Sequence, residues 1–267
     1  MGIVVITIPG EARRVFANSL HKQTGGKVDL VVIQKKRFDH NSLINRLKRL
    51  YKAVGLKALP AEIWHAILLR INGERKVLEY FRERSGDIAI DSIDEYVPKT
   101  LEVESVNSDG VFEVLKKISP SLLVIWGSTI IKPHIIGTAK CAINLHMGLC
   151  PYYRGAIANQ NAVMRRDLDK IGATIHYAEE KVDAGDILEI ITADTTKSPR
   201  EMFRDLNDKA EKRFLDVAYR LFKGETLQSR PQDITKGKNL LLKNWTPRVR
   251  YSLAKQILEW ERIGSLS

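Results

Sequence analysis

The feature that most constrains the fold is an alternation of short, apolar, β-branched runs with segments of helical periodicity. Four runs have the length and composition of strands: IVVITI (3–8), VDLVVIQ (28–34), SLLVIW (121–126) and CAINL (141–145). Continuous apolar strands linked by crossover helices are typical of a parallel sheet that is covered on both faces. We therefore predict an α/β fold, a mainly parallel, Rossmann-like open sheet with helices on both faces.

Helix signals accompany these runs. The segment EARRVFANSLHKQ is predicted to form the first crossover helix, and Gly25 and Gly26 are predicted to end it. Ser198, Pro199 and Glu201 combine an N-cap, a proline for the first helical position and a capping-box acid, so a long helix should begin there. Two further strands, GATIHYA and DILEIITA, should precede it. The turn after the first strand has neither a GxGxxG nor a GxxxxGK[ST] pattern, which gives no support for a dinucleotide or nucleoside triphosphate cradle.

The domain organisation follows from a change of pattern after the second strand. Residues 41–100 are predicted to form a helical insertion, with one helix ending at Gly55 and another starting near Pro60 and running through Ile63, Ile67 and Ile71. We predict one catalytic domain over residues 1–224, which includes this insertion. Residues 225–267 would be a C-terminal extension too short to hold a sizeable core of its own.

The formal net charge of +11 is unevenly distributed. Residues 35–57 contain eight Lys or Arg against one acid, and residues 197–255 contain fifteen against seven. Such basic stretches suit an anionic partner, such as a phosphate ester, a nucleotide or RNA, but a solvated basic surface explains them equally well. Both interpretations stay open at the level of sequence.

The location in the cell is predicted from the N-terminus and the cysteines. The apolar run at the N-terminus is too short for a signal peptide or a membrane span, and no basic segment precedes it. Cys141 and Cys150 are too few for a disulfide framework and lack the spacing of a zinc site. We expect a cytoplasmic protein with no metal centre and no membrane association.

The chemistry is expected at the end of the CAINL strand. Asn144 and His146 are two residues apart, so their side chains leave the same face of the strand about 7 Å apart. An amide donor and an imidazole at the carboxyl end of a parallel strand could stabilise an oxyanion and move protons during acyl transfer. The imidazole would need a carboxylate to orient it, and Asp183 in the loop KVDAGDI is the candidate.

Four motifs in this order closely resemble the formyltransferase superfamily that uses 10-formyltetrahydrofolate: N-x-H, L-x-P-x-x-R-G, T-I-H and V-D-A-G-D-I-L. The superfamily includes glycinamide ribonucleotide, methionyl-tRNA and sugar N-formyltransferases, and the resemblance covers roughly residues 101–224. It implies that Asn144, His146 and Asp183 are the catalytic residues. It also implies two folate-contacting loops, with Trp126, Gly127, Ser128, Thr129 and Ile130 in one and Val182 and Asp183 in the other.

The chain departs from the family pattern at two positions near the catalytic strand. Many relatives have Ser where this chain has Gly148, and Leu where it has Cys150. Among the neighbouring residues, Tyr152, Arg154 and Gly155 are candidates for contacts with the acceptor, although Arg154 is equally suited to fasten the loop to backbone carbonyls. His176 is predicted to be a packed strand residue and not a second base.

The resemblance implies transfer of a formyl group from 10-formyltetrahydrofolate to a primary amine of a small, phosphate-bearing acceptor, such as a nucleotide-linked amino sugar. Three alternatives stay open: a methionyl-tRNA-type formyltransferase, a 10-formyltetrahydrofolate hydrolase, and an inactive binding module. The short tail favours a small acceptor over tRNA, and a nucleic-acid partner is the less favoured one. The oligomeric state is not fixed by the sequence, and a dimer is compatible with it.

Overall fold

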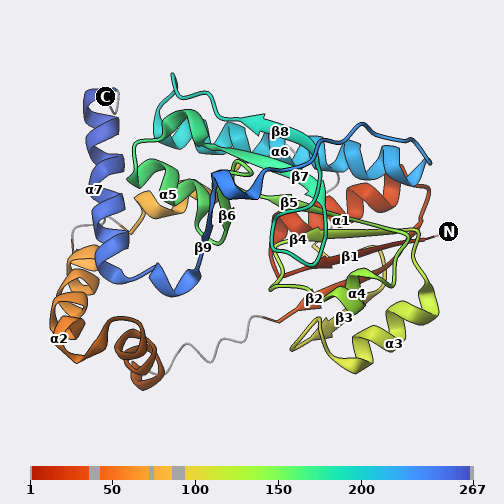
Figure 1. Cartoon of the computed structure of the whole chain (residues 1–267), viewed down its shortest axis with the longest axis horizontal. Helices are drawn as coiled ribbons and strands as arrows, with labels where there is room; N and C mark the ends of the chain where they lie inside the picture. Colours follow the sequence, from red (N-terminus) through yellow and green to blue (C-terminus); the bar gives the residue numbers. More distant parts are fainter. Residues whose placement is uncertain (1, 36–42, 72–74, 86–93, 265–267) are drawn as a thin grey trace.

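The computed structural model describes residues 2–35, 43–71, 75–85 and 94–264, and its centre is a seven-stranded sheet (Figure 1). The strands lie in the order β3 (Thr100–Val103), β2 (Val28–Gln34), β1 (Ile3–Thr7), β4 (Leu122–Trp126), β5 (Cys141–His146), β7 (Gly172–Tyr177) and β8 (Ile187–Thr192). The first five are parallel, and β7 is antiparallel to both of its neighbours. The predicted α/β fold with a mainly parallel open sheet is confirmed.

Helices cover both faces of the sheet, and the side chains of each strand alternate between two apolar cores. Figure 1 shows α1 (Glu11–Gln23) and α6 (Pro199–Phe222) on one face and α3 (Asp109–Ile118) and α4 (Pro133–Ile136) on the other. In β1, Ile3 and Val5 belong to the core under α1 and α6, whereas Val4 and Ile6 belong to the core under α3. This double-sided burial explains why the strands are apolar without interruption.

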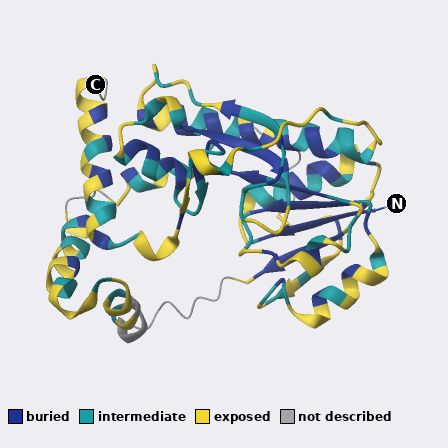
Figure 2. Ribbon diagram, viewed as in Figure 1, coloured by how far each residue is buried: buried dark blue, intermediate teal, exposed yellow. Residues whose placement is uncertain are grey.

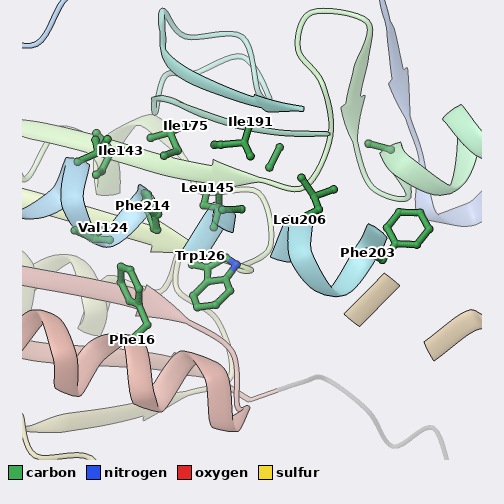
Figure 3. Close-up of a cluster of buried hydrophobic side chains, with 14 of the residues drawn as sticks. Phe16, Val124, Trp126, Ile143, Leu145, Ile175, Ile191, Phe203, Leu206 and Phe214 are labelled. Carbon is green, nitrogen blue, oxygen red and sulfur yellow. The ribbon is translucent and has the colours of Figure 1, made fainter. Parts of the chain in front are cut away.

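The core under α1 and α6 is built around aromatic rings from both helices (Figure 3). Phe16 of α1 stacks on Phe214 of α6 with ring centroids 5.2 Å apart, and it meets Trp126 edge to face at 5.5 Å. Trp126 is the last residue of β4. The indole therefore links this core to the carboxyl end of β4.

The helix boundaries follow the predicted signals. Helix α1 has the predicted limits, and α6 begins at Pro199, where the Ser198 side chain accepts a hydrogen bond from the Glu201 amide. Helix α6 ends before Gly224, whose φ is 86°. The short helical elements are η1 (Val77–Arg82), α5 (Ala158–Met164), η2 (Leu168–Lys170), η3 (Ile234–Lys236) and η4 (Leu242–Asn244).

The insertion after β2 contains α2 (Leu43–Ile71), which Gly55 breaks with φ 76° and ψ 173°, as predicted. Pro60 lies inside the second half of α2 and does not start it, so that part of the prediction is wrong. The apolar residues Ile63, Ile67 and Ile71 that marked this helix are exposed to solvent. Residues 41–42, 72–74 and 86–93 of the predicted insertion lie outside the described residues.

Helix α2 packs against the C-terminal helix α7 (Pro247–Ile263), and Figure 2 shows that most of α2 is exposed or half-buried. Glu62 of α2 is buried, and its carboxylate accepts a hydrogen bond of 2.8 Å from the Arg248 amide in the first turn of α7. A carboxylate at a helix N-terminus also interacts favourably with the helix dipole. On α7, Leu253, Ile257 and Trp260 are buried in the same core that α1 and α6 cover.

Three short strands were not predicted. Strand β3 is at the edge of the main sheet, and β6 (Tyr153–Gly155) and β9 (Lys238–Leu240) form a separate parallel pair. This pair fastens the tail to the loop after β5: Lys238 donates to the Tyr152 carbonyl at 3.0 Å, and Ala156 donates to the Leu240 carbonyl at 2.8 Å. Helices with the length and apolarity to cross a bilayer are not found among the described residues.

Replacement of Phe214 by Ala tests the core. Phe214 is fully buried against Phe16, so the cavity left by its ring should lower the free energy of unfolding by about 3–5 kcal/mol. Urea unfolding followed by circular dichroism measures this loss. Tyr51→Ala is the control, because Tyr51 is exposed on α2 and its loss should change the free energy by under about 0.5 kcal/mol.

Candidate active site at the carboxyl end of β5

The side chains of strand β5 alternate between an apolar face and a polar face. Ile143 and Leu145 are buried in the core under α6, and the alternation of the strand places Asn144 and His146 on the opposite face. On the neighbouring antiparallel strand β7, His176 is paired with Asn144 and Thr174 with His146. Three of these polar side chains, those of Asn144, His146 and His176, meet the same carboxylate.

That carboxylate belongs to Asp183, in the loop between β7 and β8. Its Oδ1 accepts a hydrogen bond from Asn144 Nδ2 at 3.2 Å and lies 3.4 Å from His176 Nε2. Its Oδ2 accepts from the Gly155 amide at 2.8 Å and lies 3.3 Å from His146 Nδ1. Asp183 itself has φ 48°, in the left-handed region, which aims its side chain back over the sheet.

The electrostatic environment keeps Asp183 ionised. Burial acts to raise the pKa of this carboxyl, but the neighbouring His146 and His176 side chains and the Gly155 amide outweigh it and lower the pKa to about 2. Because so weak a base is rarely protonated, Asp183 is suited to orient and attract cationic or hydrogen-bond-donating groups, and it is poorly suited to remove a proton.

The partners of the two imidazoles fix their hydrogen positions. His176 Nδ1 donates to the Tyr177 carbonyl at 2.7 Å, so in the neutral ring Nε2 is the acceptor and faces Asn144 Nδ2 at 3.1 Å. His146 Nε2 donates to the Tyr153 carbonyl at 2.8 Å. In the neutral ring Nδ1 is then the acceptor, so its contact with Asp183 is a hydrogen bond only when Nδ1 also carries a hydrogen.

The glycine at position 148 makes room for this placement of His146. An ideal Cβ on Gly148 would lie 2.3 Å from His146 Nε2, 2.4 Å from Ala158 Cβ and 2.7 Å from the Tyr153 carbonyl oxygen. Any side chain at this position must therefore displace the imidazole or the carbonyl to which it is bonded. The Gly148 departure from the family pattern consequently bears directly on His146.

The polar cluster opens into a groove with a volume of about 850 Å³. One wall is the loop after β4, which is tied down by two side chains: Thr129 donates to Gln34 Oε1 at 2.9 Å, and Asn107 donates to the Ile130 carbonyl at 2.9 Å. The opposite wall is the loop that carries Asp183, and the tail segment around Leu241 borders the groove as well. A groove of this size is within the range of small-molecule sites.

Most of the predicted site residues line this groove, and two do not. Those that line it are Asn144, His146, Asp183, Gly155, Trp126, Gly127, Ser128, Thr129, Ile130 and Val182. Tyr152 lies elsewhere, under the Lys170 ammonium at 4.8 Å from its ring centroid. Arg154 donates to the Ile234 carbonyl at 3.3 Å, which corresponds to the alternative of a loop-fastening role. We therefore leave Tyr152 and Arg154 out of the candidate site.

Sequence reasoning missed the position of His176. The residue is buried in β7, as predicted for a packed strand residue, but its Nε2 faces the polar cluster and the groove. Knowledge of the antiparallel pairing would have revealed this, because the register sets His176 opposite Asn144. The contribution of the tail to the groove had no sequence signal.

Neither cysteine has the features of a reactive thiol. Burial and the nearby Asp183 carboxylate raise the pKa of Cys150 to about 12, and burial raises the pKa of Cys141. Groups of three or more His, Cys, Asp or Glu side chains arranged to bind a metal ion are absent from the part of the chain that the structure describes.

Comparison with known proteins assigns the family. The model of the formyl transferase family matches residues 12–217, which is most of the chain. The chain belongs to the formyl transferase family. The match includes α1 from its second residue, the strands β2 to β8, and the whole Asn144–His146–Asp183 cluster, whereas β1 precedes it.

A sequence relative and two solved structures are similar to this chain. Methionyl-tRNA formyltransferase of Syntrophus aciditrophicus is 32% identical over 143 residues, which is 52% of this chain and 45% of that protein. The chain thus spans less than half the length of the curated relatives it matches. Two structures share the fold at low identity, phosphoribosylglycinamide formyltransferase from Bacillus halodurans and an N-formyltransferase from Helicobacter canadensis.

These two structures support the fold assignment alone. The Bacillus structure has a TM-score of 0.51 and 17% identity and covers 84% of this chain and 97% of its own. The Helicobacter structure has a TM-score of 0.54 and 12% identity and covers 94% of this chain and 79% of its own.

Replacement of Gly148 by Ala tests the packing around His146. The added Cβ overlaps the imidazole and the Tyr153 carbonyl, so the free energy of unfolding should fall by about 1–3 kcal/mol. Urea unfolding measures this change. Gly110→Ala is the matched control, because a Cβ at Gly110 would meet no atom within 4 Å and α3 should tolerate it. Equal stability of the two variants would contradict the role given to Gly148.

The low pKa of Asp183 predicts a pH dependence of stability. The folded-state pKa is about 2 against an ordinary value of 3.8, so this carboxylate stabilises the fold above about pH 4 and loses its contribution as the pH falls toward 2. The difference in free energy of unfolding between the native protein and Asp183→Asn should therefore be largest at neutral pH and narrow below pH 4. Urea unfolding between pH 2 and 7 measures it, with Asp109→Asn, at an exposed position in α3, as control.

Proposed function

We propose that this protein transfers a formyl group from 10-formyltetrahydrofolate to a primary amine of a small acceptor that carries phosphate. The observation that carries the proposal is the convergence of Asn144, His146 and His176 on Asp183 inside one groove, at the carboxyl end of a parallel strand. Membership of the formyl transferase family supports the same chemistry.

The proposed reaction begins with attack of the neutral amine on the formyl carbon. A carbon–nitrogen bond forms, the carbonyl oxygen gains negative charge, and collapse of this tetrahedral intermediate breaks the bond to N10 of the folate. The amine loses one proton and N10 gains one. Donors already positioned for the oxygen, together with a group that relays the proton, are the two requirements of this step.

The side chains of the cluster match both requirements. Asn144 Nδ2 is the donor best placed for the oxygen, because turning its amide away from His176 would direct a hydrogen into the groove while leaving Asp183 bonded. The His146 imidazole lies beside it, with Nδ1 3.3 Å from Asp183 Oδ2, so the carboxylate orients the ring. The acceptor nitrogen Nε2 of His176 is a site for the proton in transit.

The donor would lie along the loop after β4, between the two walls of the groove. Backbone groups from Gly127 to Ile130 are held in place by Gln34 and Asn107, and Ile130 offers an exposed apolar side chain there. Val182 lines the other wall. A flat pterin ring suits such a slot, because its edge needs polar partners and its faces need apolar ones. The Helicobacter structure similar to this chain contains folinic acid and dTDP-3-aminofucose.

A second acceptor class, an amino group carried on tRNA, is favoured by the sequence relatives, which are methionyl-tRNA formyltransferases. Salt separates the two classes. Activity on a tRNA-borne amine should fall steeply as salt rises from about 50 to 200 mM, because many phosphate contacts release counterions, whereas activity on a small acceptor should fall only slightly.

The test of the proposed function uses purified protein, 10-formyltetrahydrofolate and a panel of amino sugar nucleotides, glycinamide ribonucleotide and methionyl-tRNA. Folate absorbance and the mass of the acceptor are followed together. A gain in acceptor mass of one formyl group supports the proposal. Formate release with no acceptor present identifies a hydrolase instead, and no reaction with any acceptor contradicts the proposed function.

With the acceptor in hand, Asn144→Ala should lower kcat by about 10²- to 10³-fold, since one oxyanion donor is lost. Asn161→Ala is the matched control, because the Asn161 side-chain amide donates locally, to the carbonyl of Ile157 at the start of α5, and does not line the groove. Steady-state kinetics decide the point, and an Asn144→Ala protein with native kcat would remove Asn144 from the mechanism.

A further inference from the structure

One face of α2 is apolar and exposed along the half of the helix that follows Gly55. Contiguous apolar patches are uncommon on monomeric soluble proteins and mark sites of interaction. The large hydrophobic side chains of this face recur at the spacing of a single helical stripe. They are from 38% to 73% exposed, and we call them the α2 stripe: Leu56, Ile63, Trp64, Ile67 and Ile71.

Packing on α7 fixes the direction in which the α2 stripe faces. Glu62 and Leu69 are buried, and the Glu62 carboxylate accepts from the Arg248 amide of α7. His65 lies on the same side of the helix, with its ring centroid 5.4 Å from that of Tyr251 on α7. The stripe is on the opposite side, and Figure 1 shows α2 at the outer edge of the molecule. The stripe therefore faces away from the rest of the protein.

The charges beside the α2 stripe are all positive. The exposed charged side chains of α2 that the structure describes are those of Lys48, Lys52, Lys57 and Arg70. Glu62, the one acid in the sequence of α2, is buried against α7. In a helical projection at about 100° per residue, Lys57 borders one side of the stripe and Arg70 borders the other. The exposed side of this helix is therefore an apolar band with a cation along each edge.

This arrangement suits the surface of a membrane that contains anionic lipid. An amphipathic helix of this kind lies along the interface, with its apolar side chains among the acyl chains and Lys or Arg beside the phosphate groups. The same projection places Trp64 at the edge of the stripe next to Lys57. Trp is enriched at the boundary between acyl chains and headgroups, so its position at this edge fits the same orientation.

A second copy of the chain fits this face less well. Two α2 stripes packed together would bring Lys57 and Arg70 of one copy close to the same cations of the other. The sequence of α2 offers no exposed acid to balance them, since Glu62 is buried. Like charges placed against each other across an interface oppose association. A surface of anionic lipid supplies the negative charge that a second copy of α2 lacks.

We propose that the α2 stripe, with Lys57 and Arg70 on its borders, binds reversibly to the surface of a membrane that contains anionic phospholipid. The helix lies on the bilayer and does not cross it, and no described helix has the length and apolarity to do so. Described residues of α2 do not line the groove, so the proposal is independent of the proposed function. It departs from the expectation of no membrane association, which rests on the N-terminal apolar run.

The experiment measures binding of the full-length protein to lipid vesicles by sedimentation. Vesicles of phosphatidylcholine alone are compared with vesicles of phosphatidylcholine and phosphatidylglycerol. Binding to the mixed vesicles should be saturable and much stronger than binding to phosphatidylcholine alone. It should weaken as salt is added, because salt screens the attraction between the cations and the anionic lipid.

Tryptophan fluorescence reports whether the stripe enters the bilayer. Trp64 is 58% exposed, whereas Trp126 and Trp260 are buried in the core. Brominated lipid in the mixed vesicles should therefore quench Trp64. Trp64→Phe keeps an apolar ring at this position, so it should keep most of the binding and lose most of the quenching.

Substitution of the stripe tests the apolar contribution. The double variant Trp64→Ser, Ile71→Ser should bind the mixed vesicles roughly tenfold or more weakly, because less apolar area enters the interface. The matched control is the double variant Val97→Ser, Val114→Ser, which removes two exposed apolar side chains outside α2 and should bind like the native protein. Because all four side chains are exposed, both variants should keep the native circular dichroism spectrum.

Substitution of the bordering cations tests the electrostatic contribution. Lys57→Gln and Arg70→Gln should each weaken binding to the mixed vesicles roughly fivefold, since each removes one cation from the lipid surface. Lys117→Gln is the control, because Lys117 is exposed on α3 and lies outside the proposed surface.

Two outcomes of the vesicle experiments overturn the proposal. One is the absence of saturable binding to the mixed vesicles, and the other is native binding by the folded Trp64→Ser, Ile71→Ser variant. Light scattering tests the second copy directly. A native dimer that this variant converts to a monomer, without any binding to vesicles, would assign the stripe to self-association and overturn the membrane proposal as well.

Discussion

The carboxylate of Asp183 holds together groups from three different parts of the fold. It receives the Asn144 amide from β5 and the Gly155 amide from β6, and it faces the imidazoles of His146 and His176. The Asn144 and Gly155 N–H groups donate to this carboxylate directly, whereas the two imidazoles also donate to backbone carbonyls. Because Asp183 stays ionised, its charge is already in place before any ligand binds, and the polar groups around it need not reorganise to meet new charge.

The sheet explains why these groups meet. A parallel strand ends in the ligand-binding edge, and β5 delivers Asn144 and His146 there. Strand β7 then runs back from the end of β5 toward its start, where the Ala178 amide donates to the Ala142 carbonyl, and the loop to β8 folds over β5 so that Asp183 reaches Asn144 and His146. The parallel part of the sheet thus supplies the donors, and the antiparallel part supplies the anion.

Much of this was accessible from the sequence because local signals and burial agreed. Apolar runs gave the strands, the Ser198 cap gave the start of α6, and the motif order gave Asn144, His146 and Asp183. What escaped was set by partners distant in the chain. The position of His176 is set by the register of β7 against β5, and that of the Arg154 side chain by a backbone carbonyl of the tail. The need for glycine at position 148 is set by the His146 imidazole that lies against it.

The exposed apolar residues of α2 show a second limit of prediction from sequence. Helical spacing in Ile63, Ile67 and Ile71 correctly indicated a helix but said nothing about which side is buried. The side that packs on α7 instead carries Glu62, whose carboxylate is matched to a helix N-terminus. Hydrophobic periodicity identifies an element, whereas the choice of its buried face depends on what the rest of the chain offers.

The pairing of β6 with β9 has a mechanical consequence. The Gly155 amide donates to the Asp183 carboxylate, and Gly155 also belongs to β6, which pairs with β9 of the tail. Hydrogen bonds therefore connect this carboxylate to the C-terminal segment without interruption. Local opening of such a connected unit is cooperative. Binding of a ligand in the groove should consequently change the rate at which the backbone amide protons of β9 exchange with solvent.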